Sequence, residues 1–393
     1  MKSQISNLKS QIVVVGAGPA GSSLAIRLAK NGYSVTLIEK DRFPREKLCG
    51  EFISPECFRH FEELGVKAEM LETGADRITE TRFFSKGGRS VAVPTGWFGQ
   101  EDFALSLSRA RMDMEILDAA KAAGVRVIEG ARATGAEVQN GLIRSLKLKA
   151  DTGEKLEIDG NVFVDASGRN AALAKLAEPK GESQRINNGL VGFKSHLTGV
   201  SAEPGVCEIY FFDGGYGGLS HVEDGKANFC FLVKAGLARK FIGKTNKLFY
   251  WILSQNARAN ERMASAEPIH DWLAVAVDGF GRKRPPHADN LYTVGDAGAF
   301  IDPFTGSGML MAMESSELLA RSLEIGEERS RYYVAHERLF RKRLRVSSVL
   351  RRAAFLPNAA SAAIHLASVS DVFRSMLAKA TRARGKSSPD VTV

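Results

Sequence analysis

A glycine-rich turn near the N-terminus has the spacing of a dinucleotide-binding site. Residues 16–21 read GAGPAG, a GxGxxG pattern that separates an apolar β-branched run from a segment with helical periodicity. Gly16 permits a tight turn, Gly18 lets the backbone approach a pyrophosphate, and Gly21 allows the helix to pack closely on the strand. Free N–H groups at the start of a helix bind phosphate oxygens. The pattern predicts pyrophosphate contacts from Gly16, Gly18, Ala20 and Gly21.

An acidic residue follows this turn at the distance expected for a nucleotide ribose. Glu39 lies eighteen residues after Gly21, at the end of the alternating β-branched segment 34–38. A carboxylate at this place accepts hydrogen bonds from ribose hydroxyls and repels a 2′-phosphate. The β-α-β unit therefore predicts FAD or NAD rather than NADP, and it leaves the choice between the first two open.

A second glycine-rich segment, late in the chain, favours a flavin. Residues 295–309 (GDAGAFIDPFTGSGM) follow the apolar run LYTV and precede a helical segment that starts near Leu310. Asp296, at the end of a strand, can accept a hydrogen bond from a polyol hydroxyl. A positive helix N-terminus beside a flavin stabilises the anionic reduced ring. We therefore predict cofactor contacts at Asp296, Gly306, Gly308 and Met309.

Three ordered motifs resemble the FAD-dependent class A monooxygenase superfamily and, within it, the geranylgeranyl reductase branch. They are GAGPAG with Glu39, DASGR at residues 165–169, and GDAGAFIDPFTGSGM, and the resemblance covers about residues 11–330. It implies FAD bound non-covalently, with NADH or NADPH as an electron donor that docks transiently. Non-enzymatic prenyl-protein carriers of the Rab escort type also resemble this fold, but Asp296 and the glycines after it argue against that class.

The resemblance also assigns cofactor contacts elsewhere in the chain. Residues 44–50 (PREKLCG) are similar to the PxxKxCG segment of the reductase branch, in which Cys49 and Gly50 would lie against the flavin. Arg109 matches an arginine of the family that contacts the cofactor, and Asp165 begins the motif that passes beneath the pyrophosphate. The structural alternatives are a buried thiol for Cys49, an ion pair for Arg109 and a strand-end turn for Asp165.

The reaction is predicted less sharply than the cofactor. Prenyl reductases resemble one another in a PxYxxWxFP pattern, whereas residues 212–220 (FDGGYGGLS) keep Tyr216 and lack the tryptophan and the FP pair. This departure puts monooxygenation first: hydroxylation or epoxidation, through a flavin C4a-hydroperoxide, of an apolar aromatic, polyketide-like or isoprenoid substrate. Reduction of isoprenoid double bonds is second. Flavin-dependent halogenation is third, because the GWxWxIP signature is absent and Lys86, loosely at the position of a halogenase lysine, is better explained as a turn residue.

Four side chains are candidates for a catalytic role, although no triad, carboxylate pair or metal-ligand spacing stands out. His221, Asp213 and Tyr216 fall on the predicted substrate sheet, where they could orient a substrate or move a proton. Cys49 is the fourth candidate, because of its expected place beside the ring. Ordinary turn or sheet positions are the alternative for the first three, and no metal is expected.

The net charge of +9 is concentrated at the C-terminus. Residues 338–386 hold twelve Lys or Arg and one acid, so this tail carries +11 and the rest of the chain −2. A nucleic-acid partner is not expected, because its footprint would spread over a binding face. The tail fits two amphipathic helices with a solvated basic face, and the alternative is peripheral contact with an anionic membrane. Four cysteines without a close pair and a polar N-terminus favour a cytoplasmic protein.

The order of elements predicts an α/β fold. We expect a Rossmann-like FAD-binding domain of the GR2 type, an inserted antiparallel β-sheet substrate domain, and a helical C-terminal tail. The predicted FAD-binding domain is discontinuous and comprises residues 1–75, 100–183 and 277–330; the substrate domain comprises 76–99 and 184–276; the tail is 331–393. The partner expected for the substrate domain is an apolar small molecule.

Overall fold

The computed structural model describes residues 11–98, 101–178, 189–277 and 279–380 of the chain. A five-stranded parallel sheet with the order β20-β12-β1-β2-β8 carries the predicted nucleotide-binding motifs. Because its strands are parallel, their carboxyl ends meet at one edge, where ligands bind in such folds. Its strands are β1 (Gln11–Val15), β2 (Ser34–Ile38), β8 (Arg126–Ile128), β12 (Val162–Asp165) and β20 (Leu291–Thr293).

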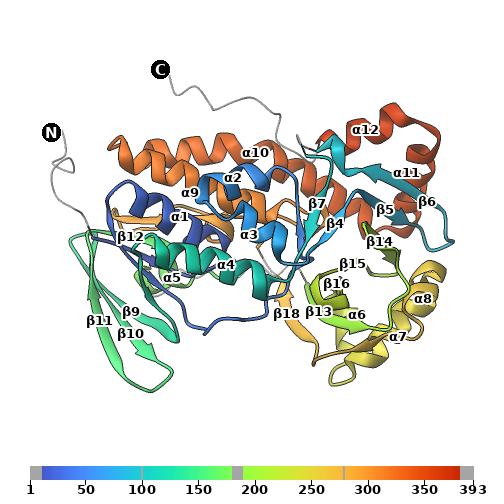
Figure 1. Ribbon diagram of the computed structural model, residues 1–393, viewed down its shortest axis with the longest axis horizontal. Coiled ribbons are helices and arrows are strands. Elements are labelled where there is room, and N and C mark those ends of the chain that lie inside the picture. The colour runs from blue at the N-terminus through green and yellow to red at the C-terminus, as the bar shows by residue number, and fades with distance from the viewer. Residues whose placement is uncertain (1–10, 99–100, 179–188, 278, 381–393) are drawn as a thin grey trace.

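Long helices cover this sheet. α1 (Pro19–Lys30) packs against α4 (Arg109–Ala122) and α9 (Gly308–Glu324), and α9 lies beside α10 (Arg329–Ala354) along one edge of the molecule (Figure 1). Leu24, Ile116 and Leu319 from α1, α4 and α9 are fully buried in one hydrophobic core. The α/β architecture predicted from the sequence is thus confirmed. α4 begins at Arg109, where the Ser108 hydroxyl caps the helix by accepting a hydrogen bond from Arg111 N.

A small antiparallel sheet, which we do not predict from the sequence, extends from the far side of the parallel sheet. It contains β9 (Ala131–Gln139), β10 (Leu142–Ala150) and β11 (Lys155–Asp159). Ile143, Leu146 and Leu148 of β10 are buried in the same hydrophobic core as Phe163 of β12. This packing joins the small sheet to the FAD-binding part of the chain.

An eight-stranded sheet forms the other end of the molecule (Figure 1). Its order is β17-β13-β16-β15-β14-β5-β6, with β18 also paired to β13, and it is antiparallel except for the β5–β14 pair. The strands are β5 (Glu80–Phe84), β6 (Ser90–Pro94), β13 (Leu190–Thr198), β14 (Val206–Phe212), β15 (Gly215–His221), β16 (Ala227–Lys234), β17 (Glu267–Pro268) and β18 (Leu273–Val277).

Shorter elements complete the fold. The segment predicted as strands between β16 and β17 instead forms three helices, whose apolar side chains pack on stacked aromatic residues of the large sheet. They are α6 (Ala235–Arg239), α7 (Thr245–Gln255) and α8 (Ala257–Met263). The others are α2 (Cys57–Leu64), α3 (Lys67–Glu72), α5 (Ala172–Ala177), β3 (Phe52–Ile53), β4 (Asp76–Ile78), β7 (Ala104–Ser106), β19 (Gly281–Arg282) and β21 (Ala299–Phe300).

Three helices, not the two that the sequence predicts, occupy residues 329–380. α10 is followed by α11 (Pro357–Val369) and α12 (Asp371–Ala380), because the backbone at Ser370 is extended and interrupts the second apolar pattern. α11 contacts β6 and β14, and α12 contacts β6. The last basic residues of the tail, Arg382, Arg384 and Lys386, lie outside the described residues. Among the helices that are described, none has the length and hydropathy needed to cross a bilayer.

Replacing Gly21 by alanine should destabilise the protein. A Cβ at Gly21 would overlap the carbonyl oxygen of Gly16 and would lie 3.1 Å from Ala166 Cβ, so α1 would have to move away from β1. We expect Gly21→Ala to lower the free energy of unfolding by about 1–3 kcal/mol and to lower FAD content, as measured by thermal denaturation and flavin absorbance. Gly87→Ala is the control, because nothing lies within 4 Å of its added Cβ. Equal stability of the two variants would contradict the packing argument.

Candidate functional site

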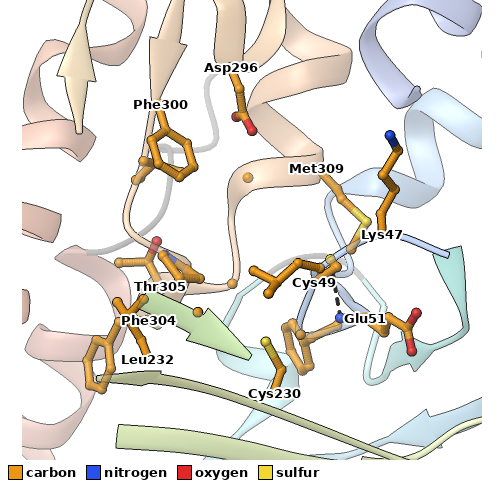
Figure 2. Close-up of a pocket in the computed structure, with 18 of the residues that line it drawn as sticks. Lys47, Cys49, Glu51, Cys230, Leu232, Asp296, Phe300, Phe304, Thr305 and Met309 are labelled. Carbon is orange, nitrogen blue, oxygen red and sulfur yellow. Dashed lines mark hydrogen bonds between the residues drawn. The ribbon is translucent and has the colours of Figure 1, made fainter. Parts of the chain in front are cut away.

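A cavity of about 590 Å³ lies between the carboxyl edge of the parallel sheet and the large sheet. Most of the predicted cofactor contacts line it, although they come from distant parts of the chain. These are Gly16, Gly18, Ala20, Glu39, Cys49, Gly50, Arg109, Asp296, Gly306, Gly308 and Met309. Figure 2 shows Asp296, Phe300 and Met309 on one side of this space and Cys230 and Phe304 on another.

Two predicted contacts, Gly21 and Asp165, are not part of the cavity wall. Gly21 packs against the Gly16 carbonyl, as described above. The buried Asp165 carboxylate accepts hydrogen bonds from Ser167 N at 2.9 Å, Ser167 Oγ at 2.6 Å and Ala174 N at 2.8 Å. These bonds order the turn at residues 166–169, which does line the cavity. Contrary to the prediction, Asp165 itself therefore does not face the cavity. It instead supports the turn that does.

Glu39 is held in place by donors from the glycine turn and from a neighbouring arginine. Its Oε2 accepts from Ala17 N at 2.9 Å and from Arg45 Nη2 at 3.5 Å, and its Oε1 accepts from Asp41 N at 3.2 Å. The side chain is buried yet borders the cavity. A carboxylate with these donors is already oriented before a ribose reaches it.

Two arginines flank the glycine turn, and the sequence predicts only one of them. Arg45 Nη1 lies 2.8 Å from Asp113 Oδ2, and Arg109 binds the same carboxylate through Nε at 2.8 Å and Nη2 at 2.7 Å. A Cβ placed on Gly18 would be 3.6 Å from Arg109 Nη2 and 3.9 Å from Arg45 Nη2. Two guanidinium groups thus share one carboxylate beside a position without a side chain, which suits the two charges of a pyrophosphate.

Asp296 points into the cavity (Figure 2) and makes no hydrogen bond with the residues that the structure describes. Burial raises the pKa of its carboxyl to about 6, and the positive charges of Lys283, Arg109 and Arg169 oppose that rise. A carboxylate that is partly buried and has no partner within the described part of the chain needs donors from a ligand. The hydroxyls of a flavin's polyol chain are such donors, and α9 presents its N-terminus at Gly308, also in the wall.

The four catalytic candidates separate into two pairs. Cys49 and Tyr216 line the cavity, and the Tyr216 hydroxyl donates to Asp302 Oδ1 at 2.7 Å. His221 and Asp213 do not line it: His221 Nε2 bonds the Ala202 carbonyl at 2.9 Å, and Asp213 forms an ion pair of 2.6 Å with Lys86. His221 and Asp213 are therefore ordinary sheet and turn residues, the structural alternative to a catalytic role. Lys86 is likewise a turn residue.

The part of the cavity farther from the glycine turn is apolar. Its wall contains Phe83, Val91, Val93, Ile209, Phe211, Leu232, Val275, Val277, Phe300, Phe304, Leu350, Ala360, Ala363, Ile364 and Ala367. Most of these side chains come from the large sheet and from α10 and α11, while Phe300 comes from β21 and Phe304 from the turn at Pro303–Thr305. Most charged groups of the wall thus lie at the nucleotide end, and the opposite end is a largely apolar chamber whose wall also includes Arg374 of α12.

Removing the charge of Asp296 should weaken FAD binding and stabilise the FAD-free protein at high pH. Because burial raises the pKa of Asp296 from 3.8 to about 6, its stabilising effect is present at low pH and is lost as the pH rises through 6. Asp296→Asn cannot ionise, so its melting temperature should exceed that of the wild type at about pH 8 by more than at about pH 5.

The same variant should bind FAD about tenfold or more weakly, since it loses a hydrogen bond to a charged acceptor. Titration of the FAD-free protein with FAD measures this loss. Unchanged affinity would contradict the place that we give to Asp296.

Several curated proteins are similar to this chain over most of its length. Digeranylgeranylglycerophospholipid reductase of Methanosarcina acetivorans is 26% identical over 312 residues, which cover 78% of this chain and 73% of that protein. The corresponding reductase 1 of Methanothermobacter thermautotrophicus is 26% identical over 342 residues, covering 85% and 82%. Conditioned medium factor receptor 1 of Dictyostelium discoideum is 25% identical over 79% of this chain, which spans 62% of that longer protein.

Solved structures share the fold at lower identity. The flavin-dependent brominase Bmp2 has a TM-score of 0.80 at 20% identity, over 96% of this chain and 95% of its own. A geranylgeranyl bacteriochlorophyll reductase-like protein from Thermoplasma acidophilum has a TM-score of 0.77 at 19% identity, over 95% and 96%. The sequence profile described as the FAD binding domain matches residues 9–329. The chain therefore belongs to the FAD binding domain family, a family of FAD-dependent oxidoreductases.

Proposed function

We propose that this protein is a FAD-dependent reductase of double bonds in an isoprenoid-type chain, with NADH or NADPH as the electron donor. The observation that carries the proposal is the continuity of one cavity from the glycine turn at Gly16 to the apolar chamber under α11. The names of the reductases at 26% identity support this choice over the monooxygenation that the sequence alone places first.

The chamber suits a substrate that is recognised by shape and apolar surface. An isoprenoid chain has no hydrogen-bonding groups, so its binding depends on burial, at about 25 cal/mol per Å². Ala360, Ala363 and Ala367 follow one side of α11, and all three line the wall. Their small side chains leave space between the helix and the large sheet, where a methyl-branched chain would fit.

Reduction of a double bond adds one hydride and one proton, and NADH or NADPH is oxidised in the process. Bound FAD, held by the glycine turn, Glu39 and Asp296, would supply the chemistry of hydride transfer from the nicotinamide to the substrate. The protein must supply the proton. Burial, together with the negative charge of Asp302, raises the pKa of Tyr216 far above its usual value, so this hydroxyl retains its proton.

Cys49 is the better proton donor. Its side chain lines the cavity, as does that of Arg109, so a positive charge would lie near the sulfur from which the proton leaves. Because Arg109 is itself paired with Asp113, its position is fixed while that charge develops.

Monooxygenation of an apolar substrate is the second candidate. The observation that favours it is the stretch at residues 212–220, which lacks the tryptophan and the FP pair shared by prenyl reductases. Lys86 gives no support to halogenation, since it lies outside the cavity wall and pairs with Asp213.

A bulky side chain on α11, at a position that lines the apolar chamber, should block substrate binding and leave FAD binding unchanged. We expect Ala363→Phe to lower kcat/KM for a geranylgeranyl-chain lipid about tenfold or more, while FAD content stays at the wild-type level. Turnover is followed as substrate-dependent oxidation of NADH or NADPH without oxygen. Ala362→Phe is the matched control, because Ala362 is exposed on the same helix. Equal activity of the two variants would count against the chamber as the substrate site.

The partner that we propose for the C-terminal helices is an anionic membrane, which would hold such a substrate. Six large apolar side chains between residues 349 and 376 are more than half exposed: Val349, Leu356, Leu366, Val369, Val372 and Met376. On α10, exposed Arg345 and Arg352 follow the same side as Val349. Apolar side chains flanked by basic ones are the composition that binds the surface of anionic bilayers.

Sedimentation with vesicles that contain anionic lipid tests this membrane contact. We expect binding at low salt that weakens as salt rises, and that is lost in the double variant Val372→Asp/Met376→Asp. Ile242→Asp is the control, because Ile242 is 76% exposed and lies between α6 and α7, elements that Figure 1 shows at the lower right, whereas α11 and α12 are at the upper right. Wild-type protein that stays in the supernatant at low salt would overturn the membrane proposal.

A further inference from the structure

A cluster of charged side chains next to Cys49 and Gly50 has no role in the proposed reaction: Lys194, His196 and Glu51 are buried, Glu46 is exposed, and Glu51 also lines the cavity. Lys194 is 1% exposed, and its Nζ lies 2.5 Å from both Glu46 Oε2 and Glu51 Oε1. His196 Nε2 lies 2.7 Å from Glu51 Oε2. A buried lysine shared by two carboxylates costs desolvation energy, so its presence beside a cofactor segment calls for a physical explanation.

The cluster joins the large sheet to the segment that carries Cys49. Gly192, Lys194 and His196 alternate along β13 and therefore share one face of the sheet. At Gly192 an added Cβ would be only 2.9 Å from Leu48 Cδ2, so the strand and the segment are in close contact. On the neighbouring strand β16, Asn228 Nδ2 donates to the Cys49 carbonyl at 3.1 Å. The large sheet thus holds residues 46–51 through both ion pairs and a hydrogen bond to the backbone.

Glu51 connects this cluster to two predicted cofactor contacts. Besides Lys194 and His196, its carboxylate accepts a hydrogen bond of 2.8 Å from Arg109 N, at the start of α4. Its own backbone has φ of 56°, in the left-handed region that is strained for a residue other than glycine. This conformation directs the Glu51 N–H to Cys49 Sγ at 3.3 Å (Figure 2).

A metal ion is a poor explanation for the cluster. Ligand atoms of Glu46, Glu51 and His196 lie within 4.8 Å of one another, as they would around a cation. However, the Lys194 ammonium contacts both carboxylates and already supplies the positive charge. The group is therefore internally paired, and its donors all converge on the Glu51 carboxylate.

We propose that Glu51 is a positioning residue, which sets the Cys49 thiol and the Arg109 backbone at the wall where the flavin ring binds. This inference rests on the proposed function, because it assumes that FAD occupies the cavity. Three donors on one carboxylate hold the strained backbone at residue 51, and that backbone fixes the thiol. The large sheet carries Lys194 and His196. A movement of this sheet would therefore displace the Glu51 carboxylate and, with it, the Cys49 thiol beside the flavin ring.

The test compares Glu51→Gln with the same substitution at a buried carboxylate of the large sheet, Glu208 on β14. Glutamine keeps the shape of the side chain but removes the charge that attracts Lys194, so residue 51 should relax. We expect the FAD-loaded variant to shift its visible absorption maxima and its flavin midpoint potential, and to lose kcat about tenfold or more with little change in KM for NADH or NADPH. Glu208→Gln is the control, since Glu208 is fully buried, pairs with Arg262 and Tyr210, and is absent from the cavity wall.

A double variant keeps the test valid if Glu51→Gln folds poorly. Glu51→Gln/Lys194→Met removes one negative and one positive charge, so it should regain thermal stability and still show the shifted flavin spectrum and potential. A wild-type spectrum and potential in both Glu51 variants, or the same shift in Glu208→Gln, would overturn the positioning role. Failure of the wild type to bind FAD or to reduce a substrate would instead contradict the proposed function.

Discussion

The close approach of α1 to the ends of three parallel strands is the constraint on which the site depends. At Gly21 the helix meets the Gly16 carbonyl, and at Gly295 an added Cβ would lie 2.8 Å from Ala20 Cβ. Positions without side chains therefore let the start of α1 sit between the loops that follow β1, β12 and β20. Only with this packing can Glu39 and Asp296, from separate strands, border one cavity together with the free N–H groups of α1.

Charge and apolar surface are distributed along that cavity in the order that the proposed reaction needs. Arg45 and Arg109 stand at the nucleotide end, where their shared partner Asp113 fixes their positions. Aromatic and aliphatic side chains line the other end. Cys49 lies at the junction, and the buried charges around Glu51 hold it there. The ion pairs of Lys194 and His196, whose burial costs desolvation free energy, thus lie where the large sheet contacts residues 46–51. This location agrees with a positioning role for Glu51.

Most of the cofactor contacts predicted from the sequence line one cavity, and the signals for them are local. A GxGxxG turn, an acid at a fixed distance and a strand followed by Asp296 each belong to a short stretch of chain. The small sheet β9–β11 could also have been found, since Asn140-Gly141 between alternating residues is a strong hairpin signal. By contrast, Lys194 and His196 approach Glu51 only through pairing across more than a hundred residues, and no local pattern predicts a contact of that kind.

The mass of the product tests the central claim most directly. The FAD-loaded protein is given NADH or NADPH and a geranylgeranyl-chain lipid, with and without oxygen, and the lipid is analysed by mass spectrometry. The account predicts a product that has gained two hydrogen atoms for each double bond reduced, formed equally well without oxygen. A product that has gained an oxygen atom, and that forms only in air, would contradict it.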